Sequence, residues 1–71
     1  MVPDDEILAF ITEYTEGHGF PPTVRELAAG VGLSSPGSMK WRIDAMRDKG
    51  LLTYETHRFR TLRVVRHEDN D

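Results

Sequence analysis

The sequence has no cysteine, no long apolar run and too few residues for two hydrophobic cores. Without cysteine, the protein cannot form disulfides, thiolate metal sites or a cysteine nucleophile. No stretch approaches the ~20 apolar residues of a membrane span, and the acidic residues at 4–6 contrast with the basic start of a secretion signal. We therefore expect the 71 residues to form one small cytoplasmic domain without a membrane partner.

Side chains with catalytic or metal-binding chemistry are also sparse. The three histidines, His18, His57 and His67, lie far apart in the sequence and lack the spacing of metal ligands. Helix capping explains Ser34 and Ser35 better than a nucleophile system does. We expect no enzyme activity, metal, cofactor or small-molecule ligand.

Basic residues are absent from positions 1–22, which carry five acidic residues. Residues 23–66 hold all nine lysines and arginines with only four acidic residues, and residues 67–71 add three acidic ones. This segregation is typical of a surface that faces a polyanion, although a solvated charged face explains it equally well. We expect residues 1–66 to form the domain and the acidic tail, 67–71, to be disordered.

Apolar residues in the first segment recur at the spacing of one helix face, namely Ile7, Phe10, Ile11 and Tyr14. The pattern predicts a helix over residues 3–16 that buries this face. Pro3 suits the first helical turn because its missing N–H would be unpaired there. The glycines at 17 and 19 are expected to end the helix.

A capping box begins the second expected helix, because Thr23 can cap the free amides while Glu26 reaches back to the backbone. The helix is short and should end in the glycine turn at 30–32. A helix of this length needs neighbours to be stable. Its inner face is expected to hold Val24, Leu27, Ala28 and Val31.

The third expected helix spans about residues 35–49, with Ser35 as N-cap and Pro36 at the first helical position. Its core face is predicted from the spacing of Met39, Ile43 and Met46. Gly50 suits the C-cap.

After Gly50 the pattern changes to alternating β-branched and aromatic residues, which predicts strands over 51–55 and 61–65. The linker at 56–60 is basic and lacks an Asn-Gly or Asp-Gly turn. Three helices followed by a two-stranded β-hairpin form a mainly α (α+β) fold, the winged helix-turn-helix.

This fold suits double-stranded DNA. The second helix of the pair fits the major groove, which is about 12 Å wide. Amides at capped helix starts can bind phosphates, and arginines of the wing can reach the backbone or the minor groove.

Several segments resemble the DNA-binding domain of the LexA repressor. They are residues 19–28 (GFPPTVRELA), 31–35 (VGLSS), 47–52 (RDKGLL) and 60–64 (RTLRV). The resemblance covers nearly the whole chain. It implies a winged helix-turn-helix that binds operator DNA and represses transcription.

The resemblance also implies which residues contact DNA. Its recognition-helix positions are Ser35, Gly37, Ser38, Lys40 and Trp41. Lys40 can donate to guanine acceptors, whereas Trp41 and Gly37 depart from the family pattern, so we expect a different operator preference. For Trp41, contact with thymine methyls, contact with a partner protein and packing against the wing remain open. Candidate phosphate contacts are Thr23, Arg25, Arg42, Arg58, Arg60 and Arg63.

Family members continue into a self-cleaving peptidase domain that dimerises them, and this chain contains none of it. We therefore expect a free-standing relative, as from a phage or mobile element, or an excised N-terminal domain. Tight binding would require a homodimer on paired half-sites. The alternative function is a winged-helix module that binds another regulator protein through Trp41, Phe59 and the acidic first helix.

Overall fold

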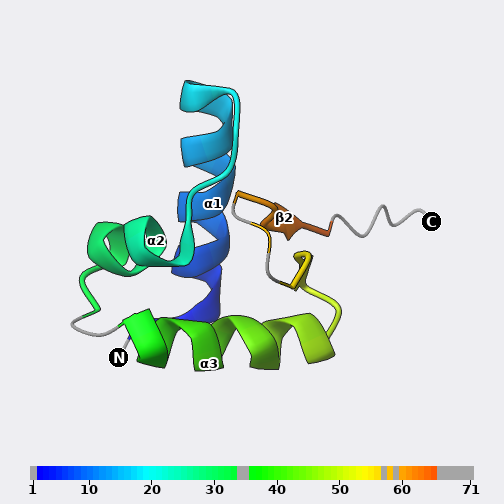
Figure 1. Ribbon diagram of the computed structural model, residues 1–71. Helices are drawn as coiled ribbons and strands as arrows, with labels where there is room; N and C mark the ends of the chain where they lie inside the picture. The colour runs from blue at the N-terminus through cyan, green and yellow to red at the C-terminus, as the bar shows by residue number, and fades with distance from the viewer. Residues whose placement is uncertain (1, 34–35, 57, 59, 66–71) are drawn as a thin grey trace.

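The computed structural model describes residues 2–33, 36–56, 58 and 60–65. Three helices precede a two-stranded antiparallel sheet in which Leu52 pairs with Val64 and Thr53 with Arg63 (Figure 1). The elements are α1 (Asp4–His18), α2 (Val24–Val31), α3 (Pro36–Asp48), β1 (Leu52–Thr53) and β2 (Arg63–Val64). This order confirms the predicted winged helix-turn-helix of the α+β class.

Helix α1 ends two residues later than the sequence predicts. It continues through Gly17 to His18, so the predicted last residue, Glu16, was wrong, whereas the predicted stop in the glycine segment at 17–19 is confirmed at Gly19. The chain turns at Gly19, where φ is 83° and the backbone N–H donates to the carbonyl of Thr15. A left-handed glycine ends a helix, whereas a glycine with helical angles only weakens it.

The predicted capping box begins α2. The backbone N–H of Glu26 donates to the Thr23 hydroxyl at 3.1 Å, and the Thr23 N–H donates to the Glu26 carboxylate at 2.9 Å. Leu27 and Ala28 are buried as predicted, and Val24 and Val31 are half-buried against the same core. These contacts hold the two-turn helix against its neighbours.

Helix α3 begins at Pro36, as predicted, and ends at Asp48, one residue before the expected end. Its predicted core residues, Met39, Ile43 and Met46, are all buried. The proposed N-cap, Ser35, lies outside the described residues, as do Phe59 and the tail at 67–71.

The wing has shorter strands than predicted, two residues each instead of five. Thr61 holds the loop between them: its hydroxyl accepts the N–H of Glu55 at 2.9 Å and lies 3.2 Å from the carbonyl of Arg58. Arg60 adopts a left-handed backbone with φ of 58°. Turn contacts therefore replace the strand pairing that we expected here.

One core joins all five elements. Ile7 and Ile11 of α1 meet the buried residues of α2 and α3, and the wing adds Leu52 and Leu62. Figure 1 shows α1 standing across α3, with α2 on one side of α1 and the wing on the other. This packing fixes which face of α3 points outward.

Candidate nucleic-acid interface

The outward face of α3 lies opposite its buried methionines and isoleucine. At 3.6 residues per turn, Gly37, Trp41 and Asp48 project from the side directly opposite the core. Trp41 is 71% exposed, so packing against the wing, one of the open alternatives, does not occur among the described residues. Ser38 and Lys40 flank this face and are also exposed.

Tyr54, just after β1, connects α3 to the wing. Its ring lies under two cations, with the Lys40 amine 5.4 Å and the Arg47 guanidinium 4.5 Å from the ring centre. Its hydroxyl donates to Asp44, which also accepts from Lys40 at 3.2 Å. The Tyr54 hydroxyl and then Lys40 lower the pKa of Asp44, while Tyr54 and Asp44 raise the pKa of Lys40. The wing and α3 are thus held in one arrangement.

Glu26 forms a second cluster at the start of α2. One of its carboxylate oxygens accepts from the Tyr14 hydroxyl at 3.1 Å and from Arg60 at 3.0 Å, in addition to the cap bond from Thr23. The other accepts from Arg60 at 2.9 Å, and the Arg60 guanidinium also lies 4.6 Å from the Phe20 ring centre. The Arg60 pair, followed by the Thr23 amide, lowers the pKa of Glu26 to about 2.

A small hollow of about 50 Å³ separates the start of α2 from the wing. Thr23 lines it on the α2 side, and Tyr54, Arg58 and Arg60 line it on the wing side. The ring of Tyr54 also contacts Lys40 and Arg47 of α3. The first turn of α2, the helix α3 and the wing therefore form one continuous surface, here called the junction surface. It brings together four predicted site residues: Thr23, Lys40, Arg58 and Arg60.

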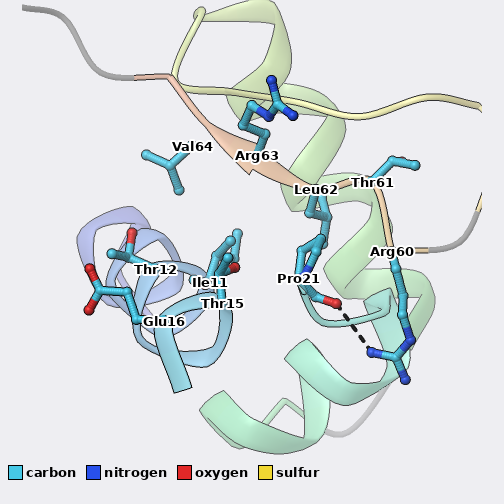
Figure 2. A pocket seen from close by; sticks show the side chains of 10 residues that line it. All are labelled: Ile11, Thr12, Thr15, Glu16, Pro21, Arg60, Thr61, Leu62, Arg63 and Val64. Atoms are coloured by element: carbon cyan, nitrogen blue, oxygen red, sulfur yellow. Dashed lines mark hydrogen bonds between the residues drawn. The ribbon is translucent and has the colours of Figure 1, made fainter. Parts of the chain in front are cut away.

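Two predicted phosphate contacts lie elsewhere. Arg42 points toward α1, where it donates to the Val2 carbonyl and to Asp4 at 2.8 Å, and its side chain is only 15% exposed. Arg63 lines a groove of about 330 Å³ between α1 and β2, opposite Thr12 and Glu16. Figure 2 shows that Arg63 and Arg60 point in opposite directions from the wing. Arg25 is exposed on α2 and forms no ion pair among the described residues.

Sequence reasoning missed Arg47 and Tyr54. A signal was present, because Lys40, Asp44 and Arg47 follow one another at i, i+4 and i+7 and so form a single charged stripe on α3. The aromatic partner of this stripe comes from the wing, and local spacing does not reveal such a contact.

The LexA DNA binding domain profile matches residues 4–61, more than half of the chain. The chain belongs to the LexA DNA-binding domain family. It is 37% identical over 62 residues to a LexA repressor of Carboxydothermus hydrogenoformans, covering 87% of this chain and 30% of that protein. It is 41% identical over 60 residues to a LexA repressor of Lactobacillus acidophilus, covering 84% of this chain and 29% of that protein.

The chain therefore spans about 30% of the length of the curated LexA repressors that it matches. In the described part of the chain, no helix has the length and apolar character to cross a membrane. Among the same residues, no cluster of three or more histidine, aspartate or glutamate side chains is placed to hold a metal ion.

Proposed function

We propose that this protein is a sequence-specific DNA-binding domain of a repressor, in which α3 enters the major groove and the wing contacts the backbone. The junction surface carries the proposal, because it combines a capped helix start, an exposed helix face and arginines of the wing. Family membership supports the same target, since the relatives are named repressors. The proposal implies action in the cytoplasm, where a bacterial operator lies.

The proposed base contacts are Ser35, which directly precedes α3 in the sequence, and four residues of the first half of α3: Gly37, Ser38, Lys40 and Trp41. Ser38 can bond a base edge or a phosphate, and Lys40 can donate to guanine. Because the Lys40 amine lies 3.2 Å from Asp44 in an exposed pair, it can exchange this partner for a base at little cost.

The proposed phosphate contacts are Thr23, Arg25, Arg58 and Arg60. Arg58 and Arg60 are paired with Glu55 at 3.1 Å and Glu26 at 2.9 Å, and both pairs are open to solvent. Exposed pairs contribute about 0–1 kcal/mol, so a phosphate can replace the carboxylate. We do not extend this role to Arg42 or Arg63, which lie outside the junction surface.

Binding-site selection from a random duplex pool, followed by salt titration of affinity, tests the proposal. Arg58→Ala should weaken binding to all sequences alike and reduce the log–log salt slope by about 0.9, the value for one lost phosphate contact. Lys40→Ala should instead relax preference at particular base pairs. Lys49→Ala is the matched control, because Lys49 is exposed beside Asp4 on the α1 side, and it should leave the slope unchanged.

Non-specific binding is expected at a Kd of about 10⁻⁴–10⁻⁶ M at physiological salt. Failure to bind random duplex at high micromolar protein and low salt would overturn the proposal. Tight binding is expected to need two copies on half-sites separated by one turn of DNA or a multiple of it.

The exposed indole favours one second candidate, a module that binds another regulator protein through Trp41. A stoichiometric protein partner that is lost on Trp41→Ala, together with unchanged affinity for DNA, would support this function instead.

A further inference from the structure

Trp41 is exposed to an extent that folding does not require. Among the described residues only two large hydrophobic side chains are exposed, Trp41 at 71% and Phe20 at 42%. Phe20 is partly covered by the Arg60 guanidinium and lies near the Tyr14 ring, whereas no ring or cation of the described residues packs on Trp41. An indole left in water forgoes the free energy of burial, which indicates that its partner lies outside the domain.

The position of Trp41 gives it room for a flat contact. Side chains on a helix lean toward the N-terminus, so the indole covers the turn that contains Gly37, four residues earlier. Gly37 has no side chain and is exposed, and nothing from this position fills the space beside the ring. A base edge can therefore approach the indole along α3.

The neighbouring polar groups already have partners. Lys40 is paired with Asp44 at 3.2 Å, and Asp44 accepts the hydroxyl of Tyr54 as well. In its first half, the outward face of α3 is formed by Gly37 and Trp41 and is apolar, whereas Asp48 lies about two turns further along the helix. In the major groove, the C5-methyl group of thymine is the apolar feature that distinguishes the base pairs, and apolar side chains recognise it.

We propose that Trp41 is a specificity-determining residue that packs on the C5-methyl group of a thymine in each half-site. This inference rests on the proposed function, because it requires α3 to lie in the major groove. Trp41 then selects thymine by its methyl group, at a position where Lys40 does not act.

Deoxyuridine substitution tests the contact, because it removes only the methyl group. Each thymine of the selected duplex is replaced in turn, and affinity is measured with the wild-type chain. We expect one position per half-site at which deoxyuridine weakens binding about fourfold, the value for one buried methyl group. The other thymines serve as internal controls.

Two variants assign the effect to the indole. Trp41→Ala should bind thymine and deoxyuridine duplexes equally at the sensitive position, whereas Lys40→Ala should keep the difference. A 5-methylcytosine should bind better than cytosine at the same position. Trp41 is the sole tryptophan of the chain, so its emission should change on addition of the selected duplex.

The outcomes separate this inference from the proposed function. Two results would overturn the methyl contact alone. One is tight, sequence-specific binding with no position that is sensitive to deoxyuridine. The other is that Trp41→Ala weakens binding to the thymine duplex and to the deoxyuridine duplex by the same factor. Absence of binding to any duplex would overturn the proposed function and the contact together. Because Trp41 is exposed, Trp41→Ala should fold normally, and circular dichroism checks this.

Discussion

Gly30 provides a test of the packing between α1 and α2. A Cβ atom at this position would lie 2.1 Å from Cζ and 2.2 Å from Cε2 of the Phe10 ring, against at least 3.4 Å for ordinary contact. The ring cannot withdraw easily, because it packs against the core and its centre lies 5.9 Å from that of Tyr14. Gly30→Ala should therefore force α1 and α2 apart, although Gly30 is exposed and helical.

The size of the effect follows from two opposing contributions. Overpacking costs about 1–3 kcal/mol, and so close an approach to a ring favours the upper half of that range. Replacing glycine by alanine within a helix raises the free energy of unfolding by about 1 kcal/mol. The free energy of unfolding should fall by about 1–2 kcal/mol, and Tm by about 4–8 °C for each kcal/mol.

Gly17→Ala is the matched control. Gly17 is also the second-to-last residue of its helix, α1, but nothing lies within 4 Å of the Cβ it would gain. This variant should be more stable than wild type by about 0.5–1 kcal/mol, measured by urea denaturation followed by circular dichroism. If Gly30→Ala were stabilised as much as Gly17→Ala, the proposed contact with Phe10 would be refuted. Phe10→Leu should relieve part of the loss in a double-mutant cycle.

Three further predictions concern ion pairs and hydrogen bonds. Because the folded-state pKa of Glu26 is about 2 and its ordinary value is 4.5, its contribution to stability is complete above pH 4.5 and lost toward pH 2. Glu26→Gln should therefore be less acid-sensitive than wild type in urea denaturation between pH 2 and 6. Tyr54→Phe removes the donor to half-exposed Asp44 and should lower the free energy of unfolding by about 1 kcal/mol, with unchanged secondary structure by circular dichroism. Arg42→Met should lower the free energy of unfolding by about 1–2 kcal/mol, because the Val2 carbonyl loses its donor and Asp4 keeps only the exposed Lys49. The salt slope of DNA binding should stay unchanged, and a changed slope would place Arg42 at the phosphates.

Local sequence signals predicted most of the fold. The capping box that begins α2 joins Thr23 and Glu26, which are three residues apart. Pro36 is the first residue of α3, and the spacing of Met39 and Met46 places both on one face of that helix. Each of these signals acts within one or two helical turns. The extent of the wing was not predictable in this way. Its strands are ended by the backbone turn at Arg60 and by the bonds of Thr61, which alternation of apolar residues does not encode.

The candidate site was predictable only where a residue acts through its own helix face. Exposure of Lys40 and Trp41 follows from their spacing relative to the core of α3. The partners of the arginines do not follow, since Arg42 bonds to Asp4 across 38 positions and Arg60 bonds to Glu26 across 34. Glu26 shows why: the sequence assigns it to the capping box, and the structure gives the same carboxylate a second, long-range role.

These long-range pairs change what the charge segregation means. The basic segment at 23–66 does not present all its cations to a polyanion, because Asp4 binds Arg42 and Lys49 on the α1 side of α3. On the junction surface, the exposed carboxylate of Glu26 holds Arg60 beside the start of α2, where a phosphate would bind a helix N-terminus. A phosphate that reaches this position offers Arg60 the same bidentate geometry as the carboxylate, in an exposed pair that contributes little to stability. Under the proposed function, Glu26 would orient Arg60 before DNA arrives and compete with phosphate for it, and an acidic chain would bind DNA through a few arginines that are already in place.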